Sequence, residues 1–544
     1  MSSRLVKKFN ALPRNEKAPS GLVPNEWHFD LRYIQIEPTP GHIVAIIQPQ
    51  SQFIHMERLP VGIGGRTSGI TFFPESGKEA APEVAKALLH AFVDNLGQNQ
   101  MMGSNAPPVF APWKLTTEDK DLAAAVGEEF KRLGVRAKEL HKISVSSKSV
   151  NKIMDTAFRK LFATLKQAVG FTGIAGDVIM KPDSICFHNF KLTPAPKKPS
   201  LLDHEEGPFD LALNYLQQLM NSRPPNASDI DTKTLLTAQG QELPILMKKV
   251  EDKPAAIVKA EADGGDPDAA LDYGLRLLVG LGCDANRTSA RTYLIKALSS
   301  PKATDELKAI AHGILIDWYV SSCVNDFRSR YMFAASHHAN IAAALCRRVS
   351  PPGTHASPAV LWFMSKVFEP QSKKAPELYL WFKDAVKALE FRNAQMADGR
   401  KKMEQKRLKN PNRYCCAAVG CGIEADSGRM LLRCGGKCDA DKKPSYCSKE
   451  CQLADWQNHK PFCKPGAECS VIDTGNSPRL GAGPSSKQGA IQIPITHADG
   501  STHVVSSSTL DPQMLKEIRD LAQNADVSGR GLPSMTFDLE RVTI

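Results

Sequence analysis

Residues 446–463 read YCSKECQLADWQNHKPFC, and this stretch decides the fold of the region that contains it. Seven cysteines and one histidine form four close pairs in it and upstream of it: Cys416/Cys421, Cys434/Cys438, Cys447/Cys451 and His459/Cys463. Because three or four residues separate its members, each pair can bind one tetrahedral Zn²⁺ from a single turn. Eight ligands predict two closed zinc sites. A closed site has no coordination position left for water or substrate, so both ions are expected to be structural.

The residues around these ligands resemble the MYND zinc finger, whose second half follows the pattern Y-C-x3-C-Q-x3-W-x2-H-K-x2-C. The Gly-Gly-Lys spacer between Cys434 and Cys438 is similar to the variant of the finger found in fungal members. The resemblance implies two interleaved zinc sites, the first made by Cys416, Cys421, Cys447 and Cys451 and the second by Cys434, Cys438, His459 and Cys463. Spacing alone also permits sequential pairing, and Cys415 could take the place of the adjacent Cys416.

Several residues between the ligands have expected roles that do not involve the metal. Ser448 is expected to cap a short helix that carries Trp456. Trp456 is expected to form the small apolar core that a module of this size otherwise lacks. Fingers of this type bind partners beside the second zinc, and the resemblance therefore implies Gln452, Gln457 and Lys460 as partner-binding residues.

Composition places the chain among soluble, multidomain globular proteins. It has 544 residues, a hydrophobic fraction of 42% and a net charge of +11. Nine of its thirteen cysteines lie between residues 415 and 469, which argues against a disulfide framework and for a reducing compartment. Residues 1–21 are basic and polar without the apolar core of a signal peptide, and no apolar run of about eighteen residues occurs, so neither secretion nor membrane spanning is predicted. We expect an intracellular protein, in the nucleus or the cytoplasm.

Hydrophobic periodicity divides the chain upstream of the finger into three segments. Residues 1–24 are expected to be a disordered tail. Residues 25–200 predict an α+β domain, with strands near 29–33, 43–47, 53–56 and 70–73 and then helices at 82–95, 117–133 and 153–169. Residues 201–410 predict a helical region. Within it, residues 266–320 resemble one unit of a Sel-like or tetratricopeptide solenoid, with a plain helical domain as the alternative.

The C-terminal part predicts three further segments. The finger occupies residues 411–466, and residues 467–488 are rich in Gly, Ser and Pro, which is typical of a flexible linker. In residues 489–544, two strand-like runs flank Ala498-Asp499-Gly500 and predict a hairpin, and a helical pattern follows. The predicted fold is therefore multidomain, with an α+β N-terminal domain, a helical middle region, a zinc module and a C-terminal hairpin plus helix.

A basic run lies just upstream of the first ligand: Arg400, Lys401, Lys402, Lys406, Arg407, Lys409 and Arg413. Such a run can contact nucleic acid, but a solvated helix end is the favoured interpretation.

Motifs of catalysis are missing from the sequence. MYND modules occur in SET-class methyltransferases, yet the chain has neither an Asn-His-Ser-Cys nor a Gly-Glu-Glu-Ile segment, and it has no His-Glu-x-x-His or Walker motif. We therefore expect an adaptor or regulator whose finger binds short proline-containing peptides, and the resemblance implies a role in transcriptional regulation. The alternative is an enzyme of unknown activity, for example a methyltransferase, that carries the finger as an accessory targeting module.

Overall fold

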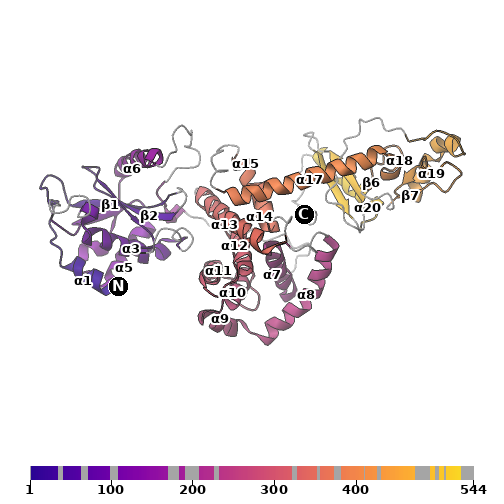
Figure 1. The fold of residues 1–544 in the computed structure, drawn as a ribbon. Coiled ribbons are helices and arrows are strands. Elements are labelled where there is room, and N and C mark those ends of the chain that lie inside the picture. The colour runs from indigo at the N-terminus through magenta and orange to yellow at the C-terminus, as the bar shows by residue number, and fades with distance from the viewer. Residues whose placement is uncertain are drawn as a thin grey trace. The chain divides into compact units, whose positions relative to one another are not determined.

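The structure is a computed structural model of the chain. The residues it describes are 2–34, 41–62, 72–98, 108–168, 183–189, 207–225, 232–321, 328–351, 356–372, 382–409, 411–425, 431–471, 491–496, 502–507 and 510–527. The chain divides into two compact units, the first made of Met1–Pro224, Met247–Val349 and Ala359–Val386, and the second of Pro225–Leu246, Ser350–Pro358 and Lys387–Ile544. Figure 1 labels many of the elements of both units, which are described separately.

A five-stranded mixed sheet forms the N-terminal part of the first unit (Figure 1). Its strands, in spatial order, are β3 (Ile54–Arg58), β2 (Gly41–Ile47), β1 (Glu26–Ile34), β4 (Lys114–Thr117) and β5 (Ser144–Val145). Strand β1 pairs antiparallel with β2 and parallel with β4.

The outcome for the predicted strands is mixed. The first three are confirmed, with small shifts in their ends. The strand expected at 70–73 is not found at Phe72 and Phe73, and residues 70 and 71 lie outside the described residues. Strand β4 was missed because four residues are too few to show the alternation of apolar and polar side chains. Its last residue, Thr117, was assigned to the following helix.

Helices cover both faces of the sheet. Helices α3 (Gly77–Val93) and α5 (Lys120–Leu133) pack against each other, and Trp27 of β1 meets Phe92 of α3 edge to face, with ring centroids 5.6 Å apart. On the other face, α6 (Lys148–Ala168) packs Phe158 against the apolar side chains of β2.

The first residues of the chain correct the prediction of a disordered tail at 1–24. Ser2–Asn10 forms helix α1, which contacts α3 and α5. Val6 and Phe9 are buried, while Arg4, Lys7 and Lys8 are exposed. The polar composition of the segment concealed this narrow apolar face.

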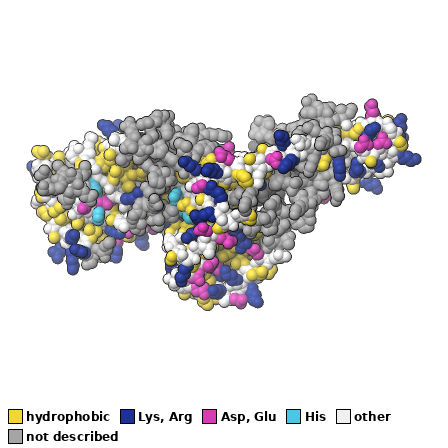
Figure 2. Space-filling model, viewed as in Figure 1, with side chains coloured by type: hydrophobic (Ala, Val, Ile, Leu, Met, Phe, Trp, Pro, Cys, Tyr) yellow, Lys and Arg dark blue, Asp and Glu magenta, His cyan; other side chains and the backbone are white. Residues whose placement is uncertain are grey.

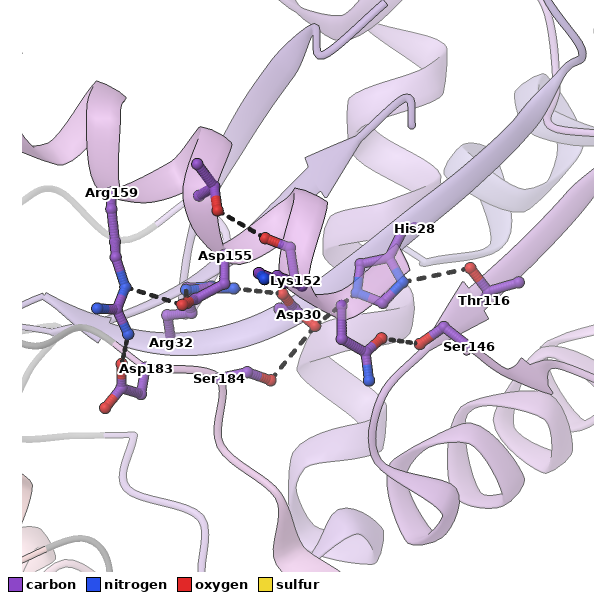
Figure 3. Close-up of polar contacts among 12 residues, drawn as sticks. His28, Asp30, Arg32, Thr116, Ser146, Lys152, Asp155, Arg159, Asp183 and Ser184 are labelled. Atoms are coloured by element: carbon purple, nitrogen blue, oxygen red, sulfur yellow. Dashed lines mark hydrogen bonds and ion pairs between the residues drawn. The ribbon is translucent and has the colours of Figure 1, made fainter. Parts of the chain in front are cut away.

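One face of β1 is polar and nevertheless buried (Figure 3). His28, Asp30 and Arg32 alternate along the strand, and each is 1% exposed. The Asp30 carboxylate accepts hydrogen bonds from His28 Nε2 at 2.8 Å and from Arg32 Nη2 at 2.6 Å, and Arg32 also donates to Asp155 of α6 at 3.1 Å. Burial by itself raises the pKa of Asp30, but the charges of His28 and Arg32 prevail and lower it below its usual range.

A stack of helices forms the rest of the first unit: α7 (Pro208–Ser222), α9 (Ala255–Asp263), α10 (Pro267–Val279), α11 (Arg287–Ser299), α12 (Asp305–Val320) and α13 (Arg328–Val349). From α9 to α13 each helix packs against the next, and α7 packs against α10 and α12. Gly274 allows the close approach of α10 to α11, because a Cβ there would lie 3.1 Å from Leu294 Cγ. After α13 come α14 (Pro358–Trp362), a π-helical segment (Phe363–Phe368) and α15 (Glu369–Ser372).

Side chains at the start of α13 join this stack to the sheet region. Arg330 is buried, donates to the carbonyl oxygen of Pro74 at 3.0 Å, and places its guanidinium 4.1 Å from the ring centroid of Phe73. The Tyr331 hydroxyl donates to Glu75 at 2.8 Å. These buried contacts explain why residues on both sides of position 200 belong to one compact unit.

The second unit contains the zinc-ligand region and the C-terminal segment. Helices α8 (Thr232–Asp252) and α17 (Lys383–Lys409) contribute residues to both units. The basic run lies on α17 and α18 (Pro411–Tyr414), where Lys402 pairs with Asp398 at 2.6 Å. Figure 2 shows Lys and Arg side chains interspersed with Asp and Glu among the described residues of the helical region. None of the described helices has the length and apolar character needed to cross a membrane.

Candidate metal centre

The zinc-ligand region is built from short elements that bring the four ligand pairs together. They are α18, β6 (Glu424–Ala425), β7 (Leu432–Arg433), β8 (Ser445–Tyr446), α19 (Lys449–His459) and a 3-10 turn (Lys460–Phe462). Strands β7 and β8 pair antiparallel. Ser448 caps α19 as predicted, because its hydroxyl accepts a hydrogen bond from Cys451 N at 3.3 Å.

The first ligand tetrad consists of Cys416, Cys421, Cys447 and Cys451. Cys447 Sγ lies 3.5 Å from both Cys421 Sγ and Cys451 Sγ, and Cys451 Sγ lies 3.8 Å from Cys421 Sγ. Zn–S bonds of about 2.3 Å would place tetrahedral sulfurs about 3.8 Å apart. The tetrad therefore has the size of a zinc site.

The second ligand tetrad consists of Cys434, Cys438, His459 and Cys463. Cys434 Sγ lies 3.8 Å from Cys463 Sγ, and Cys438 Sγ lies 3.7 Å from His459 Nε2. The other ring nitrogen, His459 Nδ1, lies 2.9 Å from Ser470 Oγ. A polar partner on the second nitrogen fixes the tautomer and the orientation of a metal-binding imidazole.

The pKa shifts differ from ligand to ligand. Hydrogen bonding among the sulfurs lowers the pKa of Cys421 and raises the pKa of Cys416 and Cys447. Burial lowers the pKa of His459, so its imidazole is neutral, as metal coordination requires. The two tetrads fit two structural zinc ions, and all their coordination positions are filled by protein ligands.

The two alternatives left by the ligand spacing are resolved. The pairing is interleaved, because each tetrad takes one pair from each half of the region. Cys415 does not replace Cys416, since its sulfur points to Glu424 Oε1 at 3.9 Å and belongs to neither tetrad. Cys469 also lies outside both tetrads, with its sulfur 3.6 Å from the carbonyl oxygen of Lys442.

The expected role of Trp456 is wrong. Its side chain is 41% exposed, and the buried aromatic side chain of the region is Tyr446, whose hydroxyl donates to Asp455 at 2.9 Å. The inward face of α19 carries Cys451, Asp455 and His459, which recur every four residues. Trp456 falls one position past this row and points outward.

The predicted partner-binding residues all lie on or directly after α19. Gln452 is partly buried, whereas Gln457 and Lys460 are exposed. The structure also places two exposed apolar side chains on this helix, Leu453 and Trp456.

The C-terminal segment packs against β6 and the first ligand tetrad of the zinc-ligand region. Strand β9 (Ile491–Thr496) pairs antiparallel with β6 on one edge and with β10 (Thr502–Ser507) on the other. Helix α20 (Pro512–Val527) buries Leu515 in the same core as Ile423. Lys516 Nζ lies 3.0 Å from Cys451 Sγ, and Arg519 donates to the carbonyl oxygen of Cys421 at 2.9 Å.

Several residues that shape the site were missed by sequence reasoning. Ser470 and Ala467 fall in the predicted linker, yet Ser470 contacts a ligand and the carbonyl oxygen of Ala467 accepts from Lys442 Nζ at 3.0 Å. Residues 472–490, which include most of that linker, lie outside the described residues.

Gly436 packs directly on the second tetrad, because a Cβ there would lie 2.1 Å from Cys463 Sγ. In the sequence, the Gly435-Gly436 spacer was the one feature that indicated this close approach of the backbone to Cys463.

Comparison with known proteins bears on this region alone. The family model of the MYND finger matches residues 413–463, which include all eight ligands. No match to a curated protein or to a solved structure is found. The matched range, the interleaved tetrads and the capped ligand helix agree, and residues 413–463 are a MYND zinc finger.

Proposed function

We propose that the chain is an adaptor or regulator whose finger binds short proline-containing peptides of partner proteins on the outer face of α19. MYND fingers are zinc-binding modules of protein interaction, which is the general role of residues 413–463. The observation that carries the proposal is the exposed pair Leu453 and Trp456, which are 66% and 41% exposed on a helix fixed by two zinc ligands.

The outer face of α19 is favoured over the rest of the finger because the C-terminal segment covers the other side. The edge of β6 is paired with β9, and α20 lies beside the first tetrad. A partner therefore meets α19 without displacing a strand of the chain itself. Leu453 and Trp456 lie three residues apart on this helix and so share a face.

The residues around this apolar pair suit a proline-rich ligand. Proline has no backbone N–H, so an extended peptide rich in proline offers mainly carbonyl oxygens as hydrogen-bond groups. Gln452, Gln457 and Lys460 supply side-chain N–H donors at the edge of the pair. Aromatic side chains provide the flat apolar surface on which such peptides pack. Transcriptional regulation, which the resemblance implies, is the proposed setting for this binding.

The test is peptide binding by the full chain. A labelled peptide of the pattern Pro-x-Leu-x-Pro is titrated against the wild-type protein and against three variants with changes on α19. Trp456→Ala is expected to weaken binding by about 30-fold, because a central tryptophan contributes about 2 kcal/mol or more to such an interface. Gln452→Ala is expected to weaken it by less. Asn458→Ala, at an exposed position two residues from Trp456, is the matched control and should bind like the wild type.

Zinc content and the circular dichroism spectrum are measured on the same samples. Both should be unchanged in all three variants, because none of the altered side chains is a zinc ligand or a core residue. Absence of saturable binding to the wild type, or equal binding by Trp456→Ala and Asn458→Ala, would refute the proposed surface.

A further inference from the structure

Three side chains of metal-ligand type meet in the first unit. Asp119 follows β4 and caps the N-terminus of α5, and Cys186 and His188 lie on the described segment 183–189. One ligand atom from each lies within 4.8 Å of the other two, as holds within each tetrad of the finger. The family model that matches the finger has no bearing on this cluster, because the match begins downstream of it, at residue 413.

Backbone contacts fix the segment that carries two of these residues. Ile185 N donates to the carbonyl oxygen of Leu31 in β1 at 2.8 Å, and the Ile185 and Phe187 side chains are buried. The His188 amide donates to Asp119 Oδ2 at 3.2 Å. Cys186 and His188 are thus held next to Asp119 by the fold itself, which reduces the entropy lost when an ion binds.

The Asp119 carboxylate is held in the way that metal-binding carboxylates are. It is buried, and Oδ1 accepts hydrogen bonds from the amides of Asp121 at 2.7 Å and Leu122 at 2.8 Å. Such hydrogen bonds orient a ligand, and the other oxygen keeps one lone pair beside the one that accepts from the His188 amide. That oxygen, Oδ2, lies 3.3 Å from His188 Nδ1.

This distance is compatible with an ion shared by the two side chains. A charge-assisted hydrogen bond from an imidazole to a carboxylate is about 2.7–2.9 Å long. Two ligand atoms that each lie about 2.0 Å from a tetrahedral zinc ion are about 3.3 Å apart. The observed 3.3 Å matches the second geometry.

The surroundings of Cys186 are negatively charged. Cys186 is buried, and the nearby carboxylates of Glu118, Asp119 and Asp30 disfavour further negative charge on its sulfur. Figure 3 shows Asp30 in the neighbouring polar row, where Arg32 pairs with it at 2.6 Å. A divalent cation between Asp119 and Cys186 would compensate the remaining negative charge.

We propose that Asp119, Cys186 and His188 form a third zinc site, located in the first unit and distinct from the finger. Oxygen, sulfur and nitrogen donors together are a typical ligand set for Zn²⁺. Three protein ligands leave a fourth position for water or a small ligand, unlike the closed tetrads of the finger. The His188 side chain is 26% exposed, so this position can be reached from solvent.

The test is the metal content of the full chain. Wild-type protein dialysed against a small excess of zinc is expected to hold three equivalents. Cys186→Ser and Asp119→Asn should each hold two. Asp119→Asn is informative because asparagine also caps helices well, so the variant removes the anionic ligand and keeps the start of α5. Cys283→Ser, at a partly buried cysteine outside all three clusters, is the control and should hold three.

A cobalt titration confirms which site is measured. Co²⁺ is added to protein that already holds two zinc equivalents in the finger, and zinc release is followed on the same samples. Uptake of one Co²⁺ with a thiolate charge-transfer band, lost in Cys186→Ser, supports the third site. Saturation of the wild type at two equivalents, three equivalents retained in Cys186→Ser, or cobalt uptake matched by zinc release would each overturn it and leave a hydrogen-bonded helix cap.

Discussion

The change Gly436→Ala tests the second zinc site most sharply. A Cβ on Gly436 would lie 2.1 Å from Cys463 Sγ and 3.4 Å from Cys434 Sγ. Since ordinary contacts begin near 3.4 Å, the Cys463 sulfur or the loop must move by about 1.3 Å. That movement is more than half the length of a Zn–S bond, which is about 2.3 Å. Overpacking of this kind costs about 1–3 kcal/mol, and the upper value corresponds to roughly 100-fold in zinc affinity.

The assay is competition for zinc between the full chain and a chromogenic chelator. The wild type should release two equivalents in the titration, and Gly436→Ala should release one of them at roughly 100-fold lower chelator concentration. Gly435→Ala is the matched control, because nothing lies within 4 Å of a Cβ at that position, and it should behave like the wild type. If Gly436→Ala retained both ions with wild-type affinity, the close packing of this loop on Cys463 would be wrong.

Three further predictions concern separate parts of the chain. Ser470→Ala removes the partner of the ligand imidazole and should weaken second-site zinc binding by about 10–100-fold in the same chelator assay. Leu515→Ala, at a fully buried side chain, should lower the unfolding free energy by about 2–5 kcal/mol in thermal melts, whereas Met514→Ala, at an exposed neighbour, should change it little. Burial lowers the pKa of His312 to about 3 and that of His338 well below its usual value. The unfolded chain then binds more protons, so stability should fall by up to about 1.4 kcal/mol per histidine for each pH unit below about 6.5. Denaturant titrations at pH 7 and pH 5 measure this loss, and equal stability at the two values would contradict it.

The ligands of the finger could be predicted from the sequence because metal binding depends on short spacings. Three or four residues between two ligands place both on one turn, and that requirement holds before any tertiary contact forms. The Ser448 cap is equally local, since it depends on the residue three positions later. The role of Trp456 was mistaken because residue type was weighed above helix phase. Cys451 and His459 lie eight residues apart, so Asp455 between them shares the inward face, and Trp456, one position past Asp455, falls off it.

The N-terminal sheet shows which structural features could not be predicted from sequence patterns. Alternation in β1 predicted the strand correctly, but such a pattern is typical of a strand whose polar face meets solvent, whereas His28, Asp30 and Arg32 are buried. Helix α6 covers that face, and Asp155 from α6 completes the charge pairing. Alternation of apolar and polar residues indicates that the two faces of a strand differ, but it does not indicate which elements cover each face. A buried network of this kind can be recognised only when the partner, more than a hundred residues away, is placed beside it.

The C-terminal segment has a consequence for how the finger can be studied. The predicted boundary at residue 466 contains every zinc ligand, yet Ile423 and Ala425 are fully buried in a core to which β9 and α20 contribute Ile491, Ile493 and Leu515. A fragment ending at 466 would expose those side chains together with the unpaired edge of β6. An open strand edge pairs readily with extended peptides through backbone hydrogen bonds, largely independent of side chains. Such a fragment would therefore bind peptides at a surface that the whole chain occupies itself, and the choice between the β6 edge and the outer face of α19 has to be made with residues 491–527 present.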